Sequence, residues 1–211
     1  MMRCDKCNGI GSIQAASSFG FPVKCFRCFG TGQIGLQHLC VGDHVCYLYK
    51  NRDDQMKTLV SFMAQGLRRN ERCLWITDGH TPQEAAAALS AVGIRVQEES
   101  AKGAVTILTK HETYLKNGRF ESKEMLSAWS RYAQETTQRG FQALRASGEL
   151  DWALEPSRDL LDEIPAYESE VDRYFLEEKP RMLALCQYDA GKTPAVTFEK
   201  IRLAHRLALQ D

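Results

Sequence analysis

The amino-terminal segment contains the same cysteine–glycine motif twice. Residues 4–11 and 25–32 both read Cys-x-x-Cys-x-Gly-x-Gly. Each cysteine pair can direct two thiolates toward one point, and two pairs supply the tetrahedral four-sulfur set of structural zinc. The glycines suit a tight turn behind the thiolates, where a positive φ is needed. We therefore predict a small module held by one zinc ion. Its predicted ligands are Cys4, Cys7, Cys25 and Cys28.

Iron, an iron–sulfur cluster and disulfides are the alternative interpretations of these cysteines. Met1-Met2-Arg3 leads straight into Cys4, without the pattern of a secretory signal. Disulfides are expected in oxidising compartments and are rare in the cytosol. The spacing and the missing signal therefore favour structural zinc in a cytoplasmic protein.

The doubled motif resembles the cysteine-rich zinc region of the DnaJ co-chaperones. That family carries four such repeats and two zinc ions, so the two repeats of this chain imply one ion. The resemblance covers residues 4–32, and the sequence contains no His-Pro-Asp signature of a J-domain. It therefore implies the zinc chemistry and not the co-chaperone function.

Length and charge limit the remaining functions. The 211 residues suit one ordinary domain plus a small appendage, and the formal net charge is zero. A neutral chain does not indicate nucleic-acid binding. Residues 1–36 carry four Lys or Arg against one Asp, a net charge of +3. This surface can face a protein partner or phosphate. No stretch approaches the ~20 apolar residues of a membrane helix, so no membrane contact is expected.

Strand-like and helix-like segments alternate from His44 onward. Short apolar runs predict five buried strands, at 45–49, 72–77, 105–108, 141–146 and 182–188. Amphipathic spacing and capping residues predict five helices. The first begins at Asp53 or Asp54, and the second runs from Thr81 to about Val92. The third covers 122–139, the fourth covers 164–176, and the last extends from near Pro194 through Leu207.

This alternation predicts an α/β fold, a parallel sheet with helices on both faces. The predicted organisation is a zinc module at 1–36, a linker at 37–43 and the α/β domain at 44–211.

Ligands of parallel sheets bind at the carboxyl ends of the strands. Residues 50–58, after the first strand, contain no glycine, although a phosphate-binding loop needs several. Asp53 and Asp54 also occupy the helix start that an anion would require. ATP hydrolysis is therefore not expected. The predicted ligand pocket lies beside polar and aromatic residues at the strand ends. They are His44, Tyr49, Asp78, Glu149, Trp152 and Tyr188. At the end of the fourth strand, a helix cap and a core tryptophan are an equal alternative for Glu149 to Trp152.

The sequence also contains four candidate ligands for a second metal ion. His38, Cys40, His44 and Cys46 offer imidazole and thiolate ligands within nine residues. Because side chains alternate along a strand, only His44 and Cys46 are sure to share a face. A core cysteine and a hydrogen-bonded histidine explain them more simply.

Residues 42–205 resemble the MEDS family, a sensory domain named for methanogens, methylotrophs and the dichloromethane regulator. The matching stretches are residues 42–49, 71–76, 112–120, 148–152 and 185–189. The resemblance implies a RecA/KaiC-like fold that lacks the phosphate loop, and a sensor of small hydrocarbon derivatives joined to an output module. KaiC-like folds often self-associate, so the resemblance leaves a homo-oligomer open.

These observations favour a cytoplasmic protein of signal transduction or transcription regulation. Its α/β domain would bind a small molecule, and its zinc module would contact a protein or nucleic acid. The sequence offers no helix-turn-helix at either end. One alternative is a scaffold whose sheet domain binds no small molecule. The other is an enzyme, either a diverged NTPase or a metal-assisted hydrolase using Glu149 and Asp151.

Overall fold

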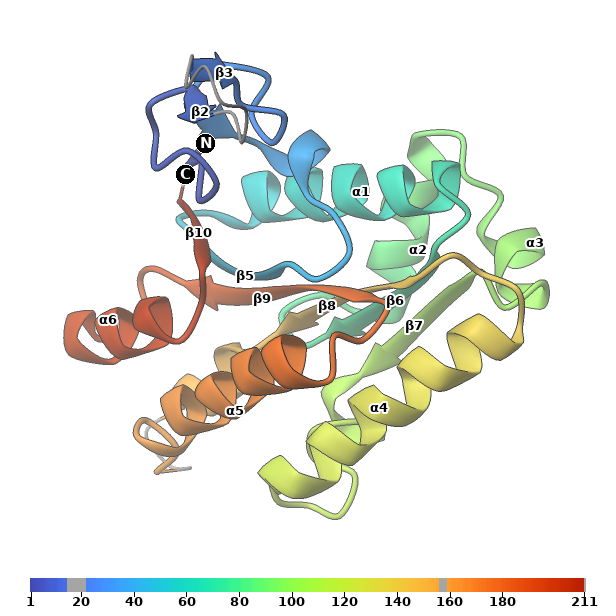
Figure 1. Cartoon of the computed structure of the whole chain (residues 1–211). Helices are drawn as coiled ribbons and strands as arrows, with labels where there is room; N and C mark the ends of the chain where they lie inside the picture. The colour runs from blue at the N-terminus through green and yellow to red at the C-terminus, as the bar shows by residue number, and fades with distance from the viewer. Residues whose placement is uncertain (15–21, 156–158, 211) are drawn as a thin grey trace.

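A six-stranded sheet organises the chain. The computed structural model describes residues 1–14, 22–155 and 159–210. The strand order is β10-β5-β9-β8-β6-β7, and every neighbouring pair is parallel (Figure 1). The predicted α/β fold is thus confirmed. The strands are β5 (His44–Tyr49), β6 (Arg72–Thr77), β7 (Val105–Thr109), β8 (Leu144–Glu149), β9 (Met182–Asp189) and β10 (Leu207–Gln210).

Helices cover both faces of this sheet (Figure 1). One face carries α1 (Arg52–Arg68), α2 (Pro82–Ala91) and α3 (Val96–Ala101). The other carries α4 (Ser122–Gln138), α5 (Glu163–Glu177) and α6 (Ala195–Leu203). Side chains of β5 alternate between the two cores: Val45 and Tyr47 pack on the α1 side, and Cys46 on the α5 side. Every residue of β6 and β8 is buried, including the polar residues Arg145, Ser147 and Glu149 of β8.

The start of α2 follows its sequence signals. Thr81 and Glu84 form a reciprocal capping box, and Pro82 occupies the first turn. The cap fixes where the chain leaves β6 and turns into α2, and this turn becomes part of the site described below.

Two sequence predictions were wrong. Gly140, at φ 84°, ends α4 as expected, but the following strand begins three residues later than predicted, at Leu144, and runs to Glu149. The last helix ends at Leu203, and Leu207 lies on β10, a sixth strand beside β5. The apolar run at 207–209 is too short to distinguish a strand from the end of a helix by periodicity.

The amino-terminal module holds two small antiparallel pairs. β1 (Met2–Arg3) pairs with β4 (Gln33–Ile34), and β2 (Ser12–Gln14) pairs with β3 (Pro22–Lys24). A short 3₁₀ helix, η1 (Leu36–His38), follows across the boundary between the predicted module and the predicted linker.

The module is packed against the sheet domain. Buried Ile34 and Leu39 belong to the same apolar cluster as the α1 side of the sheet. Arg69, after α1, donates to the carbonyls of Gln37 and Leu39 at 3.0 and 2.8 Å. Within the described residues, no helix combines the length and apolar character needed to cross a bilayer.

Candidate functional site

The four motif cysteines form a buried cluster, as predicted. Their sulfur atoms lie within 4.8 Å of one another. The Sγ atoms of Cys4 and Cys25 are 3.8 Å apart, and those of Cys7 and Cys28 are 3.6 Å apart. All four are unpaired thiols, since none forms a disulfide. The set fits a tetrahedral metal site of thiophilic type.

The two halves of the cluster have the same backbone pattern. The N–H of Gly11 donates to Cys7 Sγ at 3.2 Å, and the N–H of Gly32 donates to Cys28 Sγ at 3.3 Å. Such N–H groups favour the thiolate form that a metal requires.

The second glycine of each motif is fixed by both conformation and space. Gly11 and Gly32 have φ of 84° and 75°, a region that side chains rarely adopt. A Cβ at Gly11 would also collide with the carbonyl of Gly30, and one at Gly32 with the carbonyl of Gly9. The two motifs therefore fold as half-sites that pack closely, with the second glycine of each against a backbone carbonyl of the other.

A second polar assembly lies at the carboxyl edge of the sheet, centred on Glu149. This fully buried carboxylate accepts hydrogen bonds from three successive backbone N–H groups, those of Asp78, Gly79 and His80, at 3.0, 2.7 and 3.2 Å. The indole N–H of Trp75 donates from 3.1 Å, and the His80 ring lies at the same distance. Burial raises the pKa of Glu149, but His80 and these N–H donors outweigh it and lower the pKa below its ordinary value.

Glu149 therefore holds the loop between β6 and α2 in place. A carboxylate whose oxygens already accept several hydrogen bonds is poorly placed to abstract a proton. The geometry gives Glu149 a positioning role rather than that of a general base.

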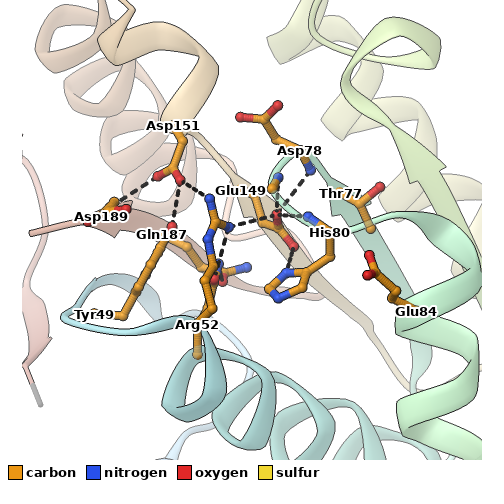
Figure 2. A network of polar contacts seen from close by, with 12 residues as sticks. Tyr49, Arg52, Thr77, Asp78, His80, Glu84, Glu149, Asp151, Gln187 and Asp189 are labelled. Atoms are coloured by element: carbon orange, nitrogen blue, oxygen red, sulfur yellow. Dashed lines mark hydrogen bonds and ion pairs between the residues drawn. The ribbon is translucent and has the colours of Figure 1, made fainter. Parts of the chain in front are cut away.

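Asp151 joins two further connections at the same edge, β5–α1 and β9–α6 (Figure 2). It accepts from the Tyr49 hydroxyl at 2.6 Å, from Arg52 Nη2 at 2.8 Å and from the Asp189 backbone N–H at 3.1 Å. Lys192 Nζ lies 3.3 Å away. Burial and the Asp151 charge raise the pKa of Tyr49, which keeps its hydroxyl protonated as a donor. Arg52 also lies 3.8 Å from Glu149, so it connects the two carboxylates.

A cleft of about 500 Å³ opens beside this network. Two cations and three carboxylates face it, with one apolar residue: Arg52, Lys192, Asp78, Asp151, Glu155 and Leu154. Lys110 holds Asp78 at 2.6 Å from the next loop. Another hollow of about 470 Å³ lies beside α4, but its charged lining, including Lys116, Lys123 and Glu124, is exposed. The cleft is therefore where charged groups from several strand ends converge.

The predicted pocket residues are divided between two faces of the sheet. Tyr49, Asp78 and Glu149 come together at the carboxyl edge, and Asp78 lines the cleft. His44, Trp152 and Tyr188 do not join them.

The side chains of His44 and Tyr188 both contact Glu168 of α5 on the opposite face. His44 begins its strand and so lies at the amino edge, and Tyr188 follows the pleat away from its neighbour Gln187, which faces α1. Trp152 is a core residue that packs 5.4 Å from the rings of Tyr114 and Phe120. These three residues therefore do not line the cleft.

The second-metal set considered from the sequence does not assemble. His38 Nδ1 accepts from the Gly35 N–H at 2.9 Å, and exposed Cys40 contacts Arg27. His44 lies with Glu168, Cys186 and His205 instead.

Arg52, His80 and Lys192 are site residues that the sequence reasoning missed. Each follows a strand end within a few residues, so the strand-end rule could have found them. The predicted pocket set contained aromatic, acidic and histidine residues but no lysine or arginine.

These observations define the structural class of the protein. It is an α/β domain of RecA/KaiC-like fold without a glycine-rich phosphate loop. A KaiC-like protein from the hyperthermophilic archaeon Pyrococcus horikoshii has a similar structure, with a TM-score of 0.57 and 13% sequence identity. The match covers 80% of this chain and 71% of that one, and at this identity it establishes the fold alone. No curated protein matches the sequence.

The family is shown by the sequence profile. The MEDS profile, described as the methanogen/methylotroph, DcmR sensory domain, matches residues 43–206. The chain belongs to the MEDS family, which indicates a sensory or regulatory role.

Proposed function

We propose that the protein is a cytoplasmic sensor. Its sheet domain binds a small polar hydrocarbon derivative in the cleft at the carboxyl edge, and its amino-terminal module carries the signal to a partner. Membership of a sensory family supports the role. The placement of Arg52 and Lys192 in the cleft supports the binding site.

The cations suggest how a ligand is recognised. Arg52 and Lys192 have 36% and 51% of their side chains exposed, and both contact Asp151. A ligand with a carboxylate or other polar oxygen can compete for these groups, since guanidinium and ammonium bind such oxygens with charge-assisted hydrogen bonds. Leu154 offers contact for a short hydrocarbon part.

The same contacts suggest how binding alters the protein. Asp151 ties Tyr49 of β5 and the Asp189 backbone of β9 to Arg52. A ligand that draws Arg52 away from Asp151 changes three loops at once. A ligand shifts a conformational equilibrium only by its difference in affinity between states, and this exchange of partners supplies such a difference.

Two matched lysine variants test the site. Lys192→Gln removes a cleft cation, whereas Lys200→Gln removes an equally exposed lysine that pairs with Asp162. Calorimetric titration with short-chain carboxylates, alcohols, amines and halogenated methanes measures the affinity. We expect at least one compound to bind and Lys192→Gln to weaken it about tenfold, as loss of one charged contact does. No binding by any compound, or an equal effect of the two variants, contradicts the proposal.

The metal of the module is proposed to be zinc. Four thiolates in a closed tetrahedral set are the usual ligands of structural zinc, and a reducing compartment keeps them available. Elemental analysis of the reduced protein should give zinc rather than iron, with the ion lost in Cys4→Ser. Iron instead of zinc would contradict this assignment of the metal.

A protein is the partner that the module surface favours. Phe26 and Phe29 are each 64% exposed and Ile10 is 77% exposed, on the loops of the two half-sites. Exposed aromatic residues are typical anchors of protein interfaces. Phe26→Ser/Phe29→Ser should abolish co-purification of a partner from the native host, while Leu203→Ser, at a residue 70% exposed on α6, should not. Retention of nucleic acid instead, sensitive to salt, would identify the other class of partner.

A further inference from the structure

A second cluster of metal-ligating groups lies on the far face of the sheet, away from the cleft and the cysteine module. His44, Glu168, Cys186 and His205 each offer one ligand atom, and these four atoms lie within 4.8 Å of one another. They come from β5, α5, β9 and the connection between α6 and β10. Figure 1 shows α5 and α6 beneath these strands, with β10 rising from α6 toward the amino-terminal module.

The spacing of these atoms is that of a coordination sphere. Glu168 Oε2 is 3.1 Å from His44 Nε2 and 3.5 Å from His205 Nε2, and Cys186 Sγ is 3.5 Å from His44 Nε2. Ligand atoms bound tetrahedrally at zinc distances lie roughly 3.3–3.7 Å apart. Small adjustments would therefore suffice to place all four around one ion.

One ring nitrogen points to the ligand more directly. His205 Nδ1 lies 2.7 Å from the Ile201 carbonyl, which makes Nδ1 the protonated nitrogen and leaves a lone pair on Nε2. That Nε2 is buried and makes no hydrogen bond within the described part of the chain. A buried polar atom without a partner requires an explanation, and a bound ion supplies one.

The surroundings match the outer contacts that metal sites use. The Tyr188 hydroxyl donates to Glu168 Oε1, which leaves Oε2 directed at the cluster. His44 Nδ1 faces Asp172 Oδ1 at 3.7 Å, an ion-pair distance rather than a hydrogen bond. A small approach would complete the carboxylate–histidine contact that orients a metal-bound imidazole. The ring of His44 is stacked on Phe175, 13° from parallel, which fixes its plane.

Charge selects the kind of ion. One thiolate, one carboxylate and two neutral imidazoles carry a charge of −2, which a divalent ion neutralises in this buried position. Mixed nitrogen, sulfur and oxygen ligands suit zinc and neighbouring transition metals rather than calcium or magnesium. Binding would release to solvent the proton of the Cys186 thiol.

We propose that His44, Glu168, Cys186 and His205 bind a second divalent transition-metal ion, of zinc type. Four protein ligands leave no open position, so the site is structural or regulatory rather than catalytic. It would join α5 and the carboxyl-terminal segment to the sheet. This inference goes beyond the proposed function and does not depend on it.

Metal stoichiometry in the full chain tests the proposal. The reduced protein is loaded with zinc, dialysed and analysed for metal per chain. We expect two ions in the wild type and one in Cys186→Ala and in His205→Gln. Cys46→Ala is the matched control, because Cys46 is the register partner of Cys186 on the neighbouring strand, is buried, and lies outside the cluster. It should retain two ions.

A measurement on the wild type removes any dependence on how the variants fold. X-ray absorption at the zinc edge averages over the bound ions. One Cys4 site and one site with a single thiolate give about 2.5 sulfur ligands per zinc, whereas the module alone gives about 4. A single ion per chain with four sulfur ligands, or two ions retained by Cys186→Ala, would overturn the proposal.

Discussion

The cysteine module and the carboxyl edge of the sheet both hold buried negative charge, and they do so by different means. At the edge, Arg52, His80 and Lys192 surround Glu149 and Asp151, together with backbone N–H groups. In the module, the sulfurs accept backbone N–H groups, those of Gly11 and Gly32 among them, and no described lysine or arginine contacts the four. The edge is therefore neutralised by protein groups alone, whereas the four cysteines form a set that could hold a metal ion.

Metal removal should separate the two regions most strongly. A chelator under reducing conditions leaves thiolates that repel one another, so the module should unfold while the sheet persists. In hydrogen exchange, amides of β1 and β4 should exchange at least ~1000-fold faster, since structural zinc contributes most of the stability of such modules. Amides of β6 and β8 should hardly change. Unchanged exchange in both regions would contradict the comparison.

Glu149→Gln should be the most costly change at the edge. It removes a buried charge and places an amide N–H₂ group against N–H donors. We expect the free energy of unfolding in urea to fall by about 3 kcal/mol. Glu124→Gln, at an exposed position on α4, should alter it by less than about 0.5 kcal/mol. Similar values for the two variants would show that the network contributes little.

Gly148→Ala tests the packing beneath the network. An added Cβ would collide with the hydroxyl of Tyr114, which is buried. Overpacking of this kind costs about 1–3 kcal/mol. Removing that hydroxyl in Tyr114→Phe should recover most of the loss in the double variant. If the double variant is as unstable as Gly148→Ala alone, the collision is not the cause.

Acidification should produce the smallest and most specific effect. The pKa of Glu149 is lowered in the folded protein, where His80 and N–H donors outweigh burial, and is about 4.3 when unfolded. The stabilisation is therefore complete above about pH 4.3 and is lost as the pH falls through the lower folded value. In that window, stability should fall less steeply in Glu149→Gln, by up to about 1.4 kcal/mol per pH unit. Parallel curves for the two proteins would exclude this role.

How far the sequence predicts each region depends on how local its contacts are. The cysteine ligands are spaced by two residues within each half-site, so their convergence can be read directly. The strand-end rule predicted that Tyr49, Asp78 and Glu149 lie at one edge, and they do, because parallel strands end at a common edge; their role in binding stays a prediction. It also misplaced Tyr188, because the rule does not say which face of the sheet a residue takes.

The remaining contacts could not be predicted because they join distant segments. His44 and Glu168 are separated by 124 residues and meet through the packing of α5 on β5. His205 reaches them because the last segment turns from α6 into β10, a strand whose short apolar run resembled the end of a helix. Assembly of this cluster depends on the completed fold.

Native mass spectrometry of the reduced full chain tests the central contrast most directly. The native mass of the wild type should exceed its denatured mass by the mass of the bound metal. In Cys4→Ser this excess should be smaller by the mass of one ion. Cys46→Ser, at a buried cysteine outside both clusters, should retain the full metal mass. A folded wild-type protein at the bare mass of the chain would mean that the four cysteines are stable without an ion, which contradicts the account.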